Sequence, residues 1–153
     1  MMVDSFYDDG ALTVRVSSEA DIPIVEGLLV QSGLPVVGWR DWWLSTVVGW
    51  FEGEIVGCAA LELYAEGALL RSVAVAEGYR GRGWGEALVG AALEMGRWRG
   101  VTAVYLLTET AVHFFPRFGF EKIEREEVPL TVRQSIEFTE ACPTTADVMR
   151  KVY

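Results

Sequence analysis

Arg80-Gly81-Arg82-Gly83-Trp84-Gly85 lies between a predicted strand, residues 68–75, and a predicted helix, residues 86–99. Glycine has no Cβ atom, so three glycines at alternate positions let the backbone approach a ligand closely. The first N–H groups of a helix have no partner within the helix, and they attract anionic oxygens, above all those of phosphates. The stretch therefore predicts a phosphate-binding loop at the start of a helix.

The spacing of the glycines narrows the kind of phosphate ligand. A dinucleotide fingerprint counted from Gly81 would need its third glycine where Glu86 stands, and no P-loop pattern occurs in the chain. The stretch instead resembles R-x-x-G-x-G, the diphosphate-binding motif of the GNAT family of N-acetyltransferases. The resemblance extends in register over residues 70–89. The family's second landmark, a short helix before a Gly-Phe strand start, is similar to residues 111–120.

This resemblance implies a fold and a cosubstrate. The fold would be a mixed α/β domain with a mostly antiparallel sheet, one splayed pair of parallel strands, and helices on both faces. Residues 70–75 and 101–107 would form the splayed pair. The cosubstrate would be acetyl-CoA, and the activity would be transfer of its acetyl group to an amine. The predicted elements agree, since strands are followed along the chain by a strand–helix–strand unit.

Length and composition predict one folded domain. A chain of 153 residues with 51% hydrophobic residues suffices for one core, and we assign residues 11–153 to it, after an acidic lead-in at residues 1–10. The formal net charge of -9 disfavours nucleic acids and anionic membranes as partners. The N-terminus lacks a signal-peptide pattern and no apolar run approaches membrane-spanning length, so we expect a cytoplasmic protein.

Cysteine and histidine contents argue against disulfides and metals. Cys58 and Cys142 are too few for a disulfide framework, and the chain has one histidine and no spacing typical of metal ligands. We therefore expect reduced thiols and no metal site. A homodimer is one of the assemblies that the sequence permits.

Hydrophobic periodicity predicts the order of elements along the chain. Strands are expected at residues 11–16, 45–51, 55–64, 68–75, 101–107, 121–128 and 142–153, with a charged loop before the last. One helix is expected after Ser17 or Ser18, a short one in the tryptophan-rich piece, and one over residues 86–99. A further short helix is expected to start at Thr108 or Thr110, with Pro116 near its end.

The resemblance assigns the cofactor contacts mainly to backbone atoms. In the family, the pantetheine arm of acetyl-CoA pairs with the first splayed strand, which implies contacts with the main chain of Val73 and Val75. The N–H of Val73 would also polarise the thioester carbonyl. Their side chains are expected to pack in the core. Backbone amides of the loop would hold the diphosphate, namely those of Arg80, Gly81, Arg82, Gly83, Gly85 and Glu86.

Acetyl transfer requires a neutral amine, so a group in the site must remove a proton from the acceptor ammonium. Glu62 is the first candidate, because strand alternation between Leu61 and Leu63 turns it to the opposite face, toward the expected cleft. A solvent-facing strand carboxylate is the alternative. Glu109, at the end of the second splayed strand, is the second candidate, and a role next to a helix N-cap is its alternative.

The sequence departs from the family at the group that protonates the departing thiolate. Phe115 stands where many members carry a tyrosine, and a phenyl ring has no proton to donate. A thiol is acidic enough for its thiolate to leave without a dedicated acid, which is one alternative. The other is a replacement donor, for which the candidates are Cys142, Ser135, Thr110 and His113.

Two residues are candidates for binding the acceptor. Arg71 is charged within an apolar strand, and a guanidinium can hold a carboxylate through two parallel hydrogen bonds. An ion pair with Glu62 is the alternative role. Trp39 belongs with Trp42 and Trp43 to a group that would either line an acceptor pocket or pack against the core.

A narrower resemblance covers most of residues 11–152. Residues 59–64, 69–75, 105–111 and 138–143 are similar to small acetyltransferases associated with arsenic-resistance gene clusters. That branch is itself similar to the acetyltransferase domain of N-acetylglutamate synthases. The resemblance implies a small, amino-acid-like amine as acceptor, for example an organoarsenical. Two other functions stay open, a non-catalytic acyl-CoA-binding module, which Phe115 favours, and acetylation of proteins or peptides.

Overall fold

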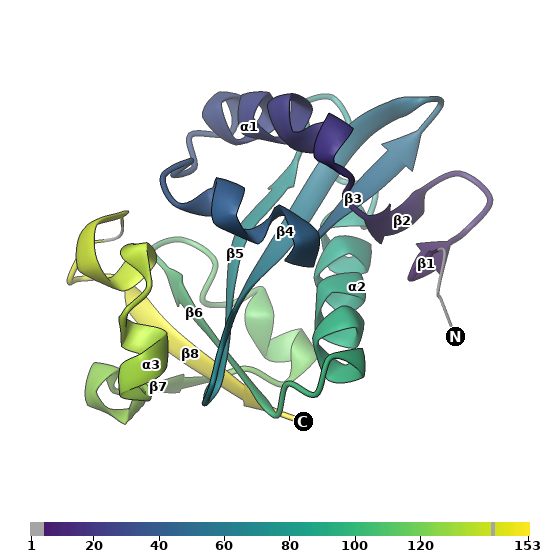
Figure 1. Ribbon diagram of the computed structural model, residues 1–153. Coiled ribbons are helices and arrows are strands. Elements are labelled where there is room, and N and C mark those ends of the chain that lie inside the picture. The colour runs from purple at the N-terminus through teal and green to yellow at the C-terminus, as the bar shows by residue number, and fades with distance from the viewer. Residues whose placement is uncertain (1–4, 142) are drawn as a thin grey trace.

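A computed structural model describes residues 5–141 and 143–153 as one mixed sheet with helices on both sides (Figure 1). The order of strands across the sheet is β1-β2-β3-β4-β5-β6-β8-β7. The strands are β1 (Tyr7–Asp8), β2 (Thr13–Val16), β3 (Thr46–Phe51), β4 (Glu54–Tyr64), β5 (Gly67–Val75), β6 (Ala103–Thr108), β7 (Glu121–Ile123) and β8 (Asp147–Val152).

The pairing between β5 and β6 is parallel, and every other pairing is antiparallel. The two strands are in register only at Ala68↔Val104 and Leu69↔Tyr105, although β5 continues to Val75 and β6 to Thr108. Beyond Leu69 the backbones therefore diverge and leave a gap in the sheet. The predicted fold, with one splayed parallel pair in a mostly antiparallel sheet, is confirmed.

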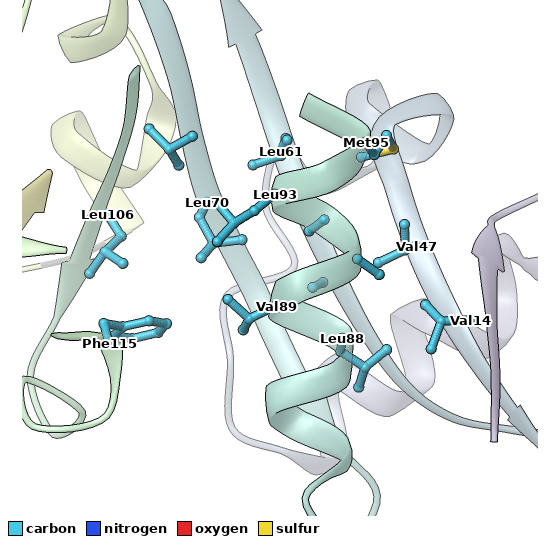
Figure 2. Close-up of a cluster of buried hydrophobic side chains, with 14 of the residues drawn as sticks. Val14, Val47, Leu61, Leu70, Leu88, Val89, Leu93, Met95, Leu106 and Phe115 are labelled. Atoms are coloured by element: carbon cyan, nitrogen blue, oxygen red, sulfur yellow. The ribbon is translucent and has the colours of Figure 1, made fainter. Parts of the chain in front are cut away.

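Two helices cover the opposite faces of the sheet, α1 (Ile22–Gln31) and α2 (Trp84–Trp98) (Figure 1). Strand alternation divides the core between them, since Leu61 of β4 packs on the α2 side and Ala60 on the α1 side. Figure 2 shows the α2 side of this core, where Leu88, Val89, Leu93 and Met95 lie against Val14, Val47, Leu61 and Leu70. No helix in the described parts of the chain has the length and apolar character needed to cross a bilayer.

Gly57 allows α2 to lie close to the sheet. A Cβ at this position would lie 2.5 Å from Cδ1 of Leu88 and 2.9 Å from the carbonyl oxygen of Ala74. Real Cβ atoms do not approach a backbone oxygen so closely, so any larger residue would push α2 and β5 away from β4, which contains Gly57. The start of α2 is thereby held near the C-terminal half of β5.

A β-bulge interrupts β5 next to the gap. Arg71 pairs with Ala60 and Ala74 pairs with Cys58, so Ser72 and Val73 together oppose the single residue Ala59. Ser72 has a φ of 57°, which is rare for a residue other than glycine. A bulge bends its strand and redirects the groups that follow it. Val73, the residue after Ser72, is the one predicted to contact the thioester.

The remaining elements follow the predicted order, with differences near both ends of the chain. Residues 1–10 were assigned to a lead-in, but Tyr7 and Asp8 form β1 and pair with β2. The carboxylates of Asp8 and Asp9 accept hydrogen bonds from the backbone N–H groups of Gly10, Ala11 and Leu12, which closes the turn. The 3₁₀ helix Trp39–Ser45 confirms the short helix predicted in the tryptophan-rich piece.

The segment between β6 and β8 differs most from the prediction. The short helix covers Phe115–Phe118, and Pro116 lies at its start rather than near its end, where its missing N–H costs nothing. The strand predicted at 121–128 ends at Ile123, because Glu124 and Glu127 form a capping box for the 3₁₀ helix Arg125–Glu127. The expected charged loop contains α3 (Leu130–Arg133) and a π-helical turn, Glu137–Ala141.

Candidate active site

Two cavities meet at Val73. The first lies where β5 and β6 diverge and has a volume of about 210 Å³. The second, of about 340 Å³, lies between the end of β5 and the glycine loop that precedes α2. Because Val73 lines both, the end of the glycine loop and the gap in the sheet open toward one common point.

Residues of the glycine loop line the second cavity. Gly81 and Gly83 have φ values of 82° and 80°, and a Cβ built on either would meet no protein atom within 4 Å. The space above both glycines is therefore open. Gly83 is the N-cap of α2, so Trp84, Gly85 and Glu86 carry the helix's first N–H groups, which have no partner within the helix. This arrangement suits an anionic group such as a diphosphate.

The two arginines of the loop make different contacts, Arg80 with the backbone of β5 and Arg82 with aromatic rings. Nε of Arg80 donates a hydrogen bond of 2.9 Å to the carbonyl oxygen of Val75, which ties the loop back to β5. The guanidinium of Arg82 lies over three aromatic rings, 5.5 Å from Phe51, 5.3 Å from Tyr79 and 5.0 Å from Trp84. Cation–π contacts of this kind contribute about 0.5–1 kcal/mol each at exposed sites. Both side chains thus stabilise the loop conformation.

Sequence reasoning missed two residues of the second cavity, Phe114 and Arg117. Nη1 of Arg117 lies 3.3 Å from Oε1 of Glu86, so an exposed ion pair joins α2 to the segment after β6. The Arg117 guanidinium also stacks on the Phe114 ring at 4.5 Å. The available sequence signal was Arg117, a cation among the phenylalanines of residues 114–118. Its contact with the glycine loop could not be predicted, because the two segments lie far apart in the sequence.

The first cavity is mainly apolar, with a few polar groups. Its polar side chains come from β5, from the end of β6 and from the turn before β8, namely Arg71, Ser72, Thr108, Thr110 and Glu137. Its apolar lining consists of Leu34, Pro35, Leu69, Leu70, Val73, Leu106, Leu107, Ala111 and Phe115. A largely apolar site with few polar groups is typical of small-molecule binding.

Glu62 lies on the predicted face but is buried in an ion pair. Its Oε2 is 2.8 Å from Nη1 of Arg71, and both side chains are 1% exposed. The hydroxyl of Tyr64 donates to Oε1 of Glu62 at 2.5 Å. Burial raises the pKa of Tyr64, and the hydrogen bond to Glu62 raises it further, so this hydroxyl remains a donor. Glu62 does not line the first cavity; the ion pair left open as an alternative is the observed arrangement.

Arg71 connects three segments at the edge of the first cavity. Its Nη2 donates to the carbonyl oxygens of Pro35 and Val37, at 3.1 and 3.0 Å, in the loop after α1. Its Nε lies 3.1 Å from Oγ of Ser72 and 3.2 Å from Oε1 of Glu137. Each of its three nitrogens thus has a protein partner, so binding a substrate carboxylate, as predicted for Arg71, would require exchanging one of these bonds.

The other predicted catalytic residues lie at varied distances from the cavity. Glu109 is exposed in the bend after β6 and does not line the cavity. Thr110 and Phe115 line it, whereas His113 is exposed and Ser135 is buried, accepting a hydrogen bond from the N–H of Glu137. Cys142 lies outside the described residues.

Trp39 packs in the core between α1 and the sheet. Its side chain is fully buried, and its Nε1 donates to Oγ1 of Thr46 at 3.0 Å. The residue does not line either cavity, so contact with an acceptor, predicted as one of its two roles, is replaced by packing. The physical reason is that the 3₁₀ helix points this ring at the sheet.

Cys58 is unsuited to act as a nucleophile. It is fully buried next to the bulge, where its thiol donates to the carbonyl oxygen of Ser72. Burial raises the pKa of this thiol to about 12, so it stays protonated in the physiological range. The chemistry of the site therefore favours direct transfer between two bound molecules over a covalent intermediate on this cysteine.

A family model described as "Acetyltransferase (GNAT) domain" matches residues 42–122 of the chain. Among curated relatives, the amino-acid acetyltransferase of Mycobacterium tuberculosis is 30% identical over 141 residues, which cover 84% of this chain and 76% of that protein. The amino-acid acetyltransferase of Pasteurella multocida is 29% identical over 136 residues, covering 82% of this chain. The present chain spans 31% of that protein's length.

Solved structures match the whole arrangement of the sheet and helices. A Mycobacterium tuberculosis protein crystallised in complex with CoA superposes with a TM-score of 0.78 at 25% sequence identity, covering 92% of this chain and 98% of that chain. The likeness therefore covers nearly the whole fold of the chain.

Proposed function

The chain belongs to the GNAT family of acetyltransferase domains, and from this premise we propose that it transfers the acetyl group of acetyl-CoA to the amine of a small acceptor. The observation that carries the proposal is the meeting of the two cavities at Val73. One cavity presents backbone amides suited to a diphosphate, and the other is an apolar gap suited to a pantetheine arm and an acceptor.

Acetyl-CoA supplies the acetyl group as a thioester. The amides of residues 81–86 bind the diphosphate, and Arg80 and Arg82 keep the loop in the receptive conformation. Beyond Leu69 the edge of β5 is not paired to β6, so its backbone is available to the pantetheine arm up to Val75. In this proposal the N–H of Val73, which follows the bulge at Ser72, stabilises the oxyanion that develops on the reacting carbonyl.

The departing thiolate needs little assistance. Phe115 lines the gap and has no proton to donate, and Thr110 is a hydroxyl-bearing residue on the same cavity. A thiol has a pKa near 8.5, so its thiolate is a far better leaving group than an alkoxide. Protonation by solvent after departure is sufficient in this proposal.

The acceptor is proposed to be an amino-acid-like amine. Relatives named amino-acid acetyltransferases support this class, and the apolar lining of the first cavity accommodates a short side chain. An amine-bearing organoarsenical is a narrower candidate within the class, resting on the sequence resemblance described above. Both acceptors place the reacting amine between the loop after α1 and the turn before β8.

Release of free thiol from acetyl-CoA tests the proposal directly. The panel comprises L-glutamate, L-leucine, L-leucinamide, spermidine and 2-aminoethylarsonate, with mass spectrometry of the acetylated product. We expect stoichiometric thiol and N-acetyl product with at least one amine. Tight CoA binding without thiol release for any amine would instead support the non-catalytic module, and release only with peptide amines would support protein acetylation.

A further inference from the structure

A second carboxylate, Glu137, lies at the edge of the first cavity and was not singled out by the sequence. Among the described residues that line this cavity, Glu137 is the one acidic side chain. Of the two predicted candidates, Glu62 is enclosed behind Arg71 and Glu109 is exposed in the bend after β6, and neither lines the cavity. Glu137 differs from both because it lines the cavity proposed for the acceptor.

The structure holds Glu137 in place through both its backbone and its side chain. Its N–H donates to Oγ of Ser135 at 3.1 Å, and the N–H groups of Phe138 and Thr139 donate to the carbonyl oxygen of Ser135. Its Oε1 lies 3.2 Å from Nε of Arg71. The residue is 6% exposed, so it belongs to a packed turn rather than to a free surface loop.

The two carboxylates that contact Arg71 differ in the solvent exposure of their side chains. The side chain of Glu137 is 8% exposed, whereas those of Glu62 and Arg71 are each 1% exposed. Arg71 lies between them, with Nη1 on Glu62 and Nε on Glu137. Glu62 thus fixes the guanidinium from inside the protein, and the guanidinium fixes Glu137 at the cavity.

We propose that Glu137 contacts the acceptor ammonium and accepts its proton, an assignment that rests on the acetyltransferase function proposed above. Transfer of one proton from the ammonium to the carboxylate gives a neutral amine and a carboxylic acid. The nitrogen lone pair then forms the C–N bond with the acetyl carbon as the C–S bond breaks, and the sulfur leaves as a thiolate. The nitrogen then loses a second proton to solvent, and the thiolate takes one proton from solvent, so that the products are the neutral amide and the free thiol.

Arg71 and Glu62 are positioning residues in this arrangement. They contact Glu137 directly or through one another, and Glu62 does not line the cavity. The titratable and charged groups linked to Glu137 in the described structure include Arg71 on β5 and, behind it, Glu62 and Tyr64 on β4. Loss of Glu62 should therefore disturb the geometry of the carboxylate without removing the proton acceptor.

The test compares Glu137→Gln with Glu140→Gln, a matched change at an exposed position of the same turn. The donor is acetyl-CoA, and the acceptor is the most active amine of the panel. We expect Glu137→Gln to lower kcat/KM for the amine about 100-fold, within the range for loss of a general base. We expect the Kd for CoA to change less than twofold, and Glu140→Gln to behave as the wild type.

Two further readouts separate proton transfer from a structural role. The activity of Glu137→Gln should rise with pH as the free amine becomes abundant, and hydroxylamine, which is already largely neutral at pH 7.5, should react at a nearly unchanged rate. Glu62→Gln should keep nearly the wild-type ratio between the rates with the panel amine and with hydroxylamine. An equal loss with hydroxylamine, or wild-type activity in Glu137→Gln, would overturn the assignment while leaving the acetyltransferase function intact.

Circular dichroism and CoA binding establish that the variant is folded. If Glu137→Gln fails either check, Glu137→Asp replaces it, because the shorter carboxylate retains the charge and should keep activity with the panel amine at reduced kcat, with hydroxylamine nearly unaffected. An equal loss with both acceptors in the folded Asp variant would overturn the proposal. If the wild type releases no thiol with any amine, the proposed function fails first, and the role of Glu137 falls with it.

Discussion

Single residues of the glycine loop set how closely a ligand can approach. Gly83 combines two properties that a side chain would remove, a φ of 80° and open space where a Cβ would stand. A residue with a Cβ is strained by about 1–2 kcal/mol in this left-handed conformation, and a β-branched residue is strained most. At Gly83 the added atoms would also project into the second cavity.

Gly83→Val should therefore weaken acetyl-CoA binding at least tenfold, which corresponds to about 1.4 kcal/mol. Isothermal titration calorimetry measures the Kd. Gly53→Val is the matched control, because Gly53 has a similar φ of 78° and equally open surroundings but lies in the β3–β4 turn. Both variants should lose similar stability. An unchanged Kd in Gly83→Val would mean that the loop does not hold the diphosphate.

The glycine loop was predictable from sequence because its requirements are local. Positive φ and a helix start within six residues leave a pattern that can be read directly. Of the partners of Arg71, Glu62 was one alternative that the sequence offered, whereas Glu137 was not predicted. Glu137 lies sixty-six residues after Arg71, and only the turn before β8 brings the two together. The role of each carboxylate depends on its position relative to Arg71: Glu62 is enclosed in the protein, whereas Glu137 lines the first cavity.

At the scale of elements, α1 and the loop after it depend on a capping box at Ser18. Oδ2 of Asp21 accepts hydrogen bonds from the backbone N–H and the hydroxyl of Ser18, and it lies 3.0 Å from Nη1 of Arg15. Burial by itself would raise the pKa of Asp21, but the hydrogen bonds from Arg15 and Ser18 outweigh it and lower the pKa. This box leads into α1, whose following loop provides the carbonyl groups that hold Arg71.

Asp21→Asn should lower the free energy of unfolding by about 1 kcal/mol at pH 7. A depressed folded-state pKa adds stability above the ordinary aspartate pKa of about 3.9, and that stability is lost as the pH falls through the lower folded-state value. The difference between variant and wild type should thus persist at pH 5 and shrink as the pH falls below the ordinary aspartate value of about 3.9. Urea unfolding at each pH measures it, with Glu19→Gln, an exposed neighbour, as control. A pH-independent difference would contradict the assignment.

Elements with strong periodicity were predictable, and the segment before β8 was not. The alternating residues of β4 and the apolar stripe of α2 each face one layer of the core, so their patterns persist in the fold. Residues 121–128 contain only two apolar residues, Ile123 and Val128, and β7 pairs with β8 only from Glu121 to Ile123, since the capping box at Glu124 ends it. At a sheet edge, a local cap competes successfully with pairing.

For the whole molecule, the gap between β5 and β6 divides the sheet into two parts. Strands β1 to β5 lie on one side, and β6, β8 and β7 lie on the other. The only direct pairing between them in the described structure is at Ala68↔Val104 and Leu69↔Tyr105. The neighbouring pairs β4–β5 and β6–β8 have seven and six paired positions, so the end of β5 and the end of β6 are expected to open most readily along the gap between them.

A cosubstrate that fills the gap should slow hydrogen exchange on both of its sides. With CoA at about 100 times its Kd, ligand binding adds about 2.7 kcal/mol of stability. We expect hydrogen–deuterium exchange measured by mass spectrometry to slow in peptides covering residues 73–75, 81–86 and 106–108, with little change in β1 and β2. Gly83→Val at the same CoA concentration should show a weaker effect, and Gly53→Val should match the wild type. Protection confined to residues 81–86 would mean that CoA binds the loop without entering the gap.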